Sequence, residues 1–169
     1  MTIRIRPATA ADAKAIRAIL LSAFPTAAEA DLVERLIADS CVLISLVAEQ
    51  DDVIVGHLLL SRMNVSGDGR SVRATGLAPV AVLPDAQRSG VGSRLIAEAL
   101  SAAAGAGEDM IFVLGDPDYY DRFGFSAETA APFASPYSGP HLQAVTLRPD
   151  VPIPQEGSAD YAPAFSALG

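Results

Sequence analysis

Gln87-Arg88-Ser89-Gly90-Val91-Gly92 is the stretch of sequence that decides the fold. It follows an apolar run, Leu77–Leu83, and precedes a segment with apolar residues at helical spacing. A strand that passes through a glycine-rich turn into a helix presents unpaired backbone N–H groups to an anion. Gly90 and Gly92 have no Cβ, so the main chain there can approach a phosphate closely. The stretch therefore predicts a pyrophosphate-binding turn.

Other phosphate-binding motifs do not fit these residues. The sequence contains no G-x-x-x-x-G-K-[ST] stretch, which excludes a P-loop. Gly90-Val91-Gly92-Ser93-Arg94-Leu95 lacks the third glycine of a dinucleotide fingerprint. By itself, Q-x-x-G-x-G is a modest signal, and a glycine-rich turn with no ligand is its other interpretation.

Size and composition predict one folded domain over residues 1–169. Half of the 169 residues are apolar and 19% are charged, which argues against disorder. No apolar run reaches the roughly 20 residues that a membrane helix needs. Met1–Pro7 alternates apolar and charged residues and has no apolar signal-peptide core. We therefore expect a cytoplasmic protein that makes no contact with a membrane.

Charge and cysteine content narrow the classes of partner. The net charge of −8 disfavours nucleic-acid binding through a broad basic surface. It weakly favours a cationic acceptor or a basic partner, with plain solubility as the alternative explanation. Cys41 is the only cysteine, which excludes an internal disulfide, and no Cys/His cluster suggests a metal site.

The order of predicted elements indicates an α+β fold. Apolar patterns and turn residues predict strands at 3–6, 41–49, 53–63, 71–83, 110–114, 142–147 and 158–161, and helices from 9, from 26, at 92–104 and at 119–123. Thr9 with Asp12, and Thr26 with Glu29, have the spacing of helix capping boxes. This order favours a central mixed, mostly antiparallel sheet with helices on both faces.

Pro79 interrupts the predicted strand 71–83. Proline cannot donate to a strand ladder, so Pro79 implies a bulge or an unpaired edge. A strand that leaves its neighbour at that point would open a slot in the sheet. The exposed edges of a small mixed sheet are also compatible with a homodimer.

Two segments together resemble one known family. Val80-Ala81-Val82-Leu83-Pro84-Asp85-Ala86-Gln87-Arg88-Ser89-Gly90-Val91-Gly92 closely resembles the signature segment of the GCN5-related N-acetyltransferases (GNAT). Tyr119-Tyr120-Asp121-Arg122-Phe123-Gly124-Phe125 matches the aromatic-Tyr-x-x-x-Gly-Phe element of the same family. Ile5-Arg6-Pro7-Ala8-Thr9, with Asp12, resembles its first strand and helix. Two further segments resemble those of a bacterial subgroup, the predicted acetyltransferases of the YhbS type. They are the loop Leu114-Gly115-Asp116-Pro117-Asp118-Tyr119-Tyr120 and the ending Tyr161-Ala162-Pro163-Ala164-Phe165.

The resemblance implies acetyl-CoA as co-substrate and no metal. The main chain of Arg88, Ser89, Gly90, Val91, Gly92 and Ser93 would hold the pyrophosphate. Val80, Ala81 and Val82 would pair like a strand with the pantetheine arm. An N–H near Val82 would polarise the thioester carbonyl. Because these are backbone roles, Val82 matters by its position. An ordinary core strand is the alternative interpretation of Val80–Val82.

The resemblance also assigns a general acid. Tyr120 matches the family position of the phenol that gives a proton to the leaving CoA thiolate, and a packed aromatic is its alternative interpretation. Met110–Leu114 lacks the carboxylate that many relatives carry there, so the base stays open. Candidates from the residues are Glu29, His57, Asp116 and Asp118, or a chain of water molecules. Glu29 and His57 are also candidate contacts to the substrate.

Purely structural interpretations of Glu29 and His57 compete with these roles. Glu29 has the spacing of a helix cap, and His57 lies in an apolar run that favours a satisfied core histidine. The leading functional interpretation is an N-acetyltransferase in which a primary amine attacks acetyl-CoA directly in a ternary complex. The acceptor is a small-molecule amine or the amine of a peptide or protein. A non-catalytic CoA-binding sensor, or an acyltransferase that uses a longer acyl-CoA, is the alternative.

Overall fold

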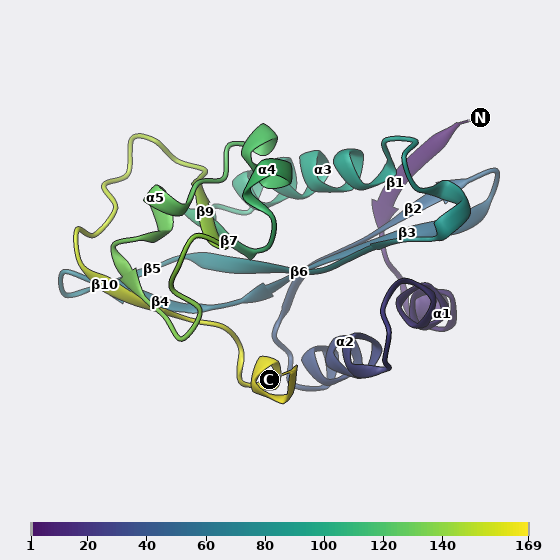
Figure 1. Ribbon diagram of the computed structural model, residues 1–169, viewed down its shortest axis with the longest axis horizontal. Coiled ribbons are helices and arrows are strands. Elements are labelled where there is room, and N and C mark those ends of the chain that lie inside the picture. The colour runs from purple at the N-terminus through teal and green to yellow at the C-terminus, as the bar shows by residue number, and fades with distance from the viewer. Residues whose placement is uncertain (1, 169) are drawn as a thin grey trace. The chain divides into compact units, whose positions relative to one another are not determined.

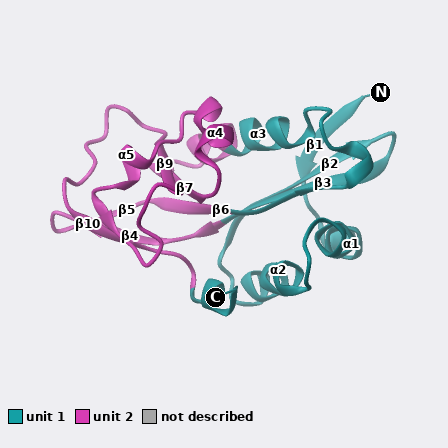
Figure 2. Cartoon of the chain, in the orientation of Figure 1, with its two compact units in different colours: residues 1–60, 78–99, 163–169 teal, residues 61–77, 100–162 magenta. Residues whose placement is uncertain are grey.

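The computed structural model describes residues 2–168 and divides into two compact units. Unit 1 comprises residues 1–60, 78–99 and 163–169, and unit 2 comprises residues 61–77 and 100–162, as Figure 2 shows. Each unit is assembled from separate stretches of chain, because strands β3 (Val53–Arg62) and β6 (Ala74–Val82) and helix α3 (Val91–Gly105) each contribute residues to both. The expectation of a single domain over residues 1–169 stays a prediction.

Unit 1 is a sheet with helices on both faces. Its strand order is β1 (Ile3–Pro7), β2 (Val42–Gln50), β3, β6, with β1 antiparallel to β2 from Ile3 opposite Gln50 to Pro7 opposite Leu46. Helices α1 (Ala13–Ala23) and α2 (Ala28–Ala38) lie on one face and the first turns of α3 on the other (Figure 1). Short 3₁₀ turns at Ala10–Asp12, Pro84–Ala86 and Pro163–Leu168 complete the unit.

The helices of unit 1 pack through apolar residues at helical spacing. Leu95, Ile96 and Ala99 on α3 are fully buried, as their spacing predicts. Gly56 of β3 makes room for this helix. A Cβ there would lie 3.0 Å from Val91 Cγ1 and 3.1 Å from Leu95 Cδ1. The absence of a side chain at Gly56 therefore sets how closely α3 approaches the sheet.

Unit 2 contains the other end of β6 and a second sheet. β7 (Met110–Leu114) pairs in parallel with β6 and antiparallel with β9 (Leu142–Thr146). The second sheet has the order β5 (Arg70–Val72), β4 (Asn64–Gly67), β10 (Gly157–Asp160), β8 (Phe133–Ala134). Two short helices, α4 (Pro117–Tyr120) and α5 (Ala127–Ala130), and a 3₁₀ turn at Asp121–Phe123 lie between β7 and β8 in the chain. The mixed sheets with helices confirm the predicted α+β fold.

Strand β6 leaves β7 early. Their pairing covers only Ala74 to Gly76, opposite Met110 to Phe112, although β7 continues to Leu114. The pairing therefore stops three residues before Pro79, close to where the proline predicted that the strand would leave its neighbour. The predicted strand 71–83 was wrong in one respect, because Arg73 separates β5 from β6. Its backbone N–H donates to the carboxylate of Asp109 at 3.1 Å.

A buried carboxylate joins the ends of three elements in unit 2. Glu108, which precedes β7, is fully buried and accepts hydrogen bonds from Arg62 and from Arg73, the latter at 3.0 Å from Nη2. Both arginines keep part of their side chains in solvent. Two guanidinium groups on one carboxylate satisfy the charge that burial would otherwise disfavour. No pattern in the sequence distinguished Glu108 from an exposed loop glutamate.

Two further features concern residues 2–168 as a whole. None of the helices formed by these residues has the length and apolar character needed to cross a membrane. Within the same range, no group of three or more His, Cys, Asp and Glu side chains is arranged to hold a metal ion.

We expect Gly56→Val to destabilise the protein by about 1–3 kcal/mol, because the added methyl groups would collide with Val91 and Leu95. Urea unfolding followed by circular dichroism measures this loss. Gly105→Val, at the open end of the same helix, is the matched control and should stay within about 0.5 kcal/mol of the unmutated protein. Equal effects at both positions would show that close packing at Gly56 is not the cause.

Candidate functional site

The turn after β6 is fixed by its own hydrogen bonds. The Leu83 N–H donates to Val55 O at 2.8 Å, and the Ala86 N–H donates back to Leu83 O at 2.9 Å. The Gln87 side chain donates through Nε2 to Val82 O at 3.0 Å. The first residue of the Q-x-x-G-x-G motif thus ties the turn to the last residue of β6. The sequence singled out Gln87, but nothing in it predicted this partner.

Two residues with left-handed backbone turn the chain into α3. Arg88 has φ 63° and Gly90 has φ 86°. A non-glycine residue in this region is uncommon and concentrates at functional sites. Between them, Ser89 donates its hydroxyl to Ala86 O. A Cβ at Gly90 would meet no atom of the protein within 4 Å, so the space beside it is open.

The first turn of α3 supplies donors for an anion. The Arg94 N–H donates to Gly90 O at 3.0 Å, which starts the helical pattern. The N–H groups of Val91, Gly92 and Ser93 precede that bond and have no partner within the helix. The Arg94 side chain reaches the β1 carbonyl of Ile3 at 2.8 Å, which also joins α3 to the edge strand of unit 1. The turn and the helix together can hold a phosphate by backbone groups.

Tyr120 lies in unit 2, whereas the glycine turn lies in unit 1. It ends α4, and its ring packs on the backbone of Gly115, where a Cβ would lie 2.6 Å from Tyr120 Cε2. The ring also makes edge contacts with Tyr119 at 5.0 Å and with Phe125 at 5.8 Å between centroids. Burial raises the pKa of Tyr120 to about 12, and Tyr119 adds to the shift. The phenol is therefore protonated at neutral pH.

Of the candidate bases near Tyr120, Asp116 has a local structural role. It is the N-cap of α4, and its carboxylate accepts from the Asp118 N–H at 2.9 Å. The Asp118 side chain is exposed.

Glu29 does not cap its helix as the T-x-x-E spacing predicted. Helix α2 begins at Ala28 with Ala27 as N-cap, and Thr26 Oγ1 accepts from the Ala28 N–H at 3.2 Å. Thr26 lies one residue before the N-cap, so its bond closes a short turn ahead of the helix, and no side chain caps α2 at Ala27. Within residues 2–168, Glu29 Oε1 is buried and has no hydrogen-bond partner. A buried carboxylate oxygen without a partner costs free energy that a hydrogen-bond donor would recover.

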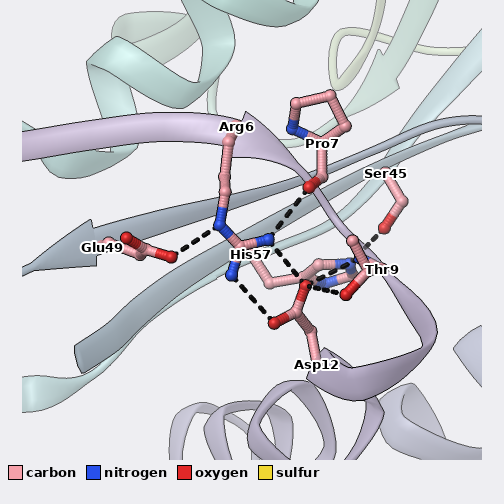
Figure 3. Close-up of polar contacts among 7 residues, drawn as sticks. All are labelled: Arg6, Pro7, Thr9, Asp12, Ser45, Glu49 and His57. Carbon is pink, nitrogen blue, oxygen red and sulfur yellow. Dashed lines mark hydrogen bonds and ion pairs between the residues drawn. The ribbon is translucent and has the colours of Figure 1, made fainter. Parts of the chain in front are cut away.

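The capping box at Thr9 and Asp12 is confirmed and belongs to a larger cluster. The Thr9 N–H donates to Asp12 at 2.7 Å, and Arg6 makes a two-pronged contact with the same carboxylate at 2.8 and 2.9 Å (Figure 3). Arg6 Nε also donates to Glu49 of β2 at 2.6 Å. Hydrogen bonds from Arg6, and then from Thr9, hold the pKa of Asp12 far below its usual range. The cluster fastens β1 to the start of the first helix.

His57 is fully buried in β3 beside this cluster (Figure 3). Its Nε2 lies 3.1 Å from Ser45 Oγ, and which atom donates depends on the tautomer. Its Nδ1 is buried and has no hydrogen-bond partner in the described chain. Burial lowers the pKa of His57 to about 4, so the ring is neutral at pH 7. The structure thus shows a core histidine that is only half satisfied.

Comparisons with known proteins point to one family. A family model described as "Acetyltransferase (GNAT) domain" matches residues 4–127. The uncharacterized N-acetyltransferase YjhQ of Escherichia coli K12 is 40% identical over 116 residues, which is 68% of this chain and 64% of that protein. The uncharacterized N-acetyltransferase YhbS of the same strain is 35% identical over 115 residues, or 68% of each chain. The chain thus covers just under two thirds of the length of YjhQ.

Two solved structures are similar over almost the whole chain. The crystal structure of the GNAT family N-acetyltransferase YhbS from Escherichia coli in complex with CoA has a TM-score of 0.86 and 29% identity. It covers 99% of this chain and 93% of that one. A GNAT family acetyltransferase from Brucella melitensis in complex with acetyl-CoA has a TM-score of 0.80 and 33% identity, with 97% and 98% covered.

We expect the buried His57 to make stability depend on pH. Because its pKa is about 4 in the folded chain and about 6.5 unfolded, the unfolded state binds a proton first as pH falls. The contribution of His57 to the free energy of unfolding is fully present above pH 6.5. It is lost between pH 6.5 and 4, which lowers the free energy of unfolding by roughly 3 kcal/mol. Urea unfolding at intervals across this range measures the loss.

His57→Gln should flatten the pH dependence between pH 6.5 and 4, because glutamine does not titrate. His141, the other histidine, is exposed, so His141→Gln is the matched control and should leave the dependence as it is. If the free energy of unfolding of His57→Gln still depends on pH in this range, other groups cause the dependence.

Proposed function

This chain belongs to the GNAT acetyltransferase family, and we propose that it transfers the acetyl group of acetyl-CoA to a primary amine by direct attack in a ternary complex. The observation that carries this proposal is the turn at Arg88–Gly90. The backbone of this turn is left-handed, and the space beside Gly90 is open. The long helix α3 begins at the next residue, Val91. The acceptor is a small-molecule amine or an amine of a peptide or protein.

The turn fits the diphosphate of CoA. The N–H groups of Arg88 to Ser93 would hold the pyrophosphate, with the positive end of the α3 dipole behind them. The absence of a side chain at Gly90 lets the phosphates approach the backbone. Similar folds in YhbS and in the Brucella melitensis protein were solved with CoA and acetyl-CoA, which supports the assignment.

The last residues of β6 would align the rest of the cofactor. Val80, Ala81 and Val82 have the backbone groups to pair with the amides of the pantetheine arm, and the Val82 N–H would polarise the thioester carbonyl. Gln87 supports the position of Val82, because its side chain donates to the Val82 carbonyl and fixes the Val82–Leu83 peptide, next to the one that carries the Val82 N–H. Acetyl-CoA itself supplies the activated acyl group.

Tyr120 would act as the general acid. As the amine nitrogen bonds to the carbonyl carbon, the carbon–sulfur bond breaks, the Tyr120 O–H bond breaks and an S–H bond forms on the departing CoA. The proton that the amine loses would pass to water, and the Tyr120 phenolate would regain a proton from water. A phenol that burial keeps protonated at neutral pH suits this donation. Gly115 supports it as well, since any side chain there would displace the Tyr120 ring.

Glu29 and His57 remain candidate contacts for the acceptor. The buried, unpartnered Oε1 of Glu29 favours a contact with a cationic amine, which would satisfy that oxygen. The net charge of −8 favours the same class of acceptor. The neutral ring of His57, buried against Ser45, favours a structural role over proton transfer.

We expect Gly90→Val to abolish binding of acetyl-CoA, because a β-branched side chain would occupy the space proposed for the phosphates. Isothermal titration calorimetry with acetyl-CoA measures this. Gly107→Val is a matched control, since Gly107 has a similar φ of 83°, also faces open space and follows the far end of the same helix. Both variants carry the same backbone strain, so unaltered binding by Gly90→Val would contradict the assignment of the turn.

We expect Tyr120→Phe to lower kcat by about 10²-fold, with little change in the affinity for acetyl-CoA, because only the proton donor is lost. Thiol release measured with a panel of amines gives kcat, and calorimetry gives the affinity. Tyr119→Phe removes a neighbouring hydroxyl and serves as the control. An unchanged kcat in Tyr120→Phe would remove that residue from the mechanism.

The same assay separates the alternatives. Binding of acetyl-CoA without thiol release from any amine would favour a CoA-binding sensor. Faster release from propionyl- or succinyl-CoA than from acetyl-CoA would favour a longer acyl donor.

A further inference from the structure

A hollow on unit 2 is lined by the two arginines that contact Glu108. Its volume is about 420 Å³, and its lining comes from the end of β3, from β4, and from β5 with the residue that follows it. The polar part of the lining consists of Arg62, Asn64, Ser71 and Arg73. The proposed acetyl transfer uses none of these four residues.

Strand alternation places polar side chains on one face of β4 and β5. Val65 and Val72 lie opposite each other and are buried in the core of unit 2. Asn64, Ser71 and Arg73 are their neighbours in the chain and are exposed. Because successive side chains of a strand point to opposite faces, these three lie on the solvent side. That face therefore presents an amide, a hydroxyl and a guanidinium group.

Glu108 holds two guanidinium groups in place beside this face. Arg62 Nη1 donates to one oxygen of the carboxylate, and Arg73 donates to the other through Nε at 3.2 Å and Nη2 at 3.0 Å. The carboxylate is fully buried, whereas the side chains of Arg62 and Arg73 keep 41% and 60% of their surface exposed. A guanidinium group that is already fixed loses little side-chain entropy when it binds a further group.

The two arginines have more charge and more donors than Glu108 uses. One guanidinium group balances the charge of the carboxylate, so one positive charge remains on the pair. Among the described residues, Arg62 Nε and Nη2 and Arg73 Nη1 have no hydrogen-bond partner. Nε and Nη2 of one guanidinium form a fork whose geometry matches two oxygens of a carboxylate or a phosphate.

One carboxylate flanks the hollow on its far side. Asp160 of β10 lies opposite Asn64 and is exposed, and β4 separates β10 from β5. Opposite residues of paired strands have their side chains on the same face, so Asp160 is a neighbour of Asn64. Within residues 2–168, Asp160 forms no ion pair with either arginine. Its charge weakens the attraction of the hollow for an anion without occupying the donors.

We propose that this hollow binds an oxyanion, the phosphate or carboxylate group of a small molecule, between Arg62 and Arg73. The fork of Arg62 and the Nη1 of Arg73 would donate to its oxygens, and the Asn64 amide and the Ser71 hydroxyl would add donors. This site binds by side chains of unit 2, whereas the proposed diphosphate site binds by backbone N–H groups of unit 1. The inference does not depend on the proposed function.

Titration of the ¹⁵N-labelled protein with inorganic phosphate at neutral pH, with sodium chloride keeping the ionic strength constant, tests this site. We expect the side-chain Nε–H resonances of Arg62 and Arg73 to shift together with the backbone amides of Asn64 and Ser71, and to saturate with one Kd. Arg62→Lys removes one Nε–H resonance and so identifies it. A second titration with acetate distinguishes a carboxylate from a phosphate ligand. The backbone amides of residues 89–93 report separately on the proposed diphosphate site.

Asn64→Asp and Arg148→Gln are a matched pair, because each makes the net charge more negative by the same amount. Asn64→Asp places a carboxylate in the hollow at an exposed position and should raise the Kd for phosphate at least about tenfold. Arg148 contacts Asp109 at 3.7 Å and does not line the hollow, so Arg148→Gln should change the Kd less than about twofold. Asp160→Asn removes the flanking carboxylate and should lower the Kd about two- to threefold.

The outcomes decide between a binding site and a purely structural pair of arginines. Saturable shifts with phosphate or acetate that Asn64→Asp weakens and Arg148→Gln does not would support the site. Shifts that chloride reproduces, or equal losses in the two variants, would overturn it, since both indicate a general effect of charge. Absence of shifts at Arg62 and Arg73 with either anion would also overturn it. Acetyl-CoA binding and transfer are measured separately, so the proposed function stands or falls by its own experiments.

Discussion

The left-handed backbone at Arg88 and Gly90 is the constraint on which the proposed chemistry depends. It turns the chain between the end of β6 and the start of α3, whose first N–H groups have no partner within the helix. The hydrogen bonds of Leu83, Ala86 and Gln87 hold the turn in this conformation without using those groups. The energy of an unusual conformation at Arg88 is thus offset by bonds inside the turn, which leaves the donors to a ligand.

Glycines serve a different purpose in unit 2. Gly76 and Gly115 lie on or beside strands, and their importance lies in the aromatic rings that cover them. Tyr161 and Tyr120 thereby pack directly on main chain, where few rotamers are open to them. A ring held in this way has little conformational freedom left to lose in a reaction. This would favour Tyr120 in its proposed role as proton donor.

The sequence predicted the elements better than their partners. Strand and helix periodicities located the sheet, α3 and the short helix at Tyr119, and the proline in β6 indicated where pairing would stop, because these depend on local pattern. The cap at Thr9 and Asp12 was also predictable, whereas the capping box predicted from Thr26 and Glu29 does not form, because α2 has Ala27 as its N-cap. The packing of Tyr161 on Gly76 and the partners of Glu108 depend on residues far apart in the chain. The contacts of Tyr120 with Gly115 and of Gln87 with Val82 join residues five positions apart and depend on the exact path of the backbone between them. No spacing in a single sequence encodes these contacts.

The hydrogen bond from Arg94 to the carbonyl of Ile3 has a consequence for strand β1. β1 is an edge strand, paired on one side only with β2 and pinned at its end by Arg6 and Asp12. Because Arg94 directly follows the residues whose N–H groups are the proposed donors, fraying of the edge strand would reach the first turn of α3. Order in β1 would therefore help to keep the proposed anion-binding turn rigid.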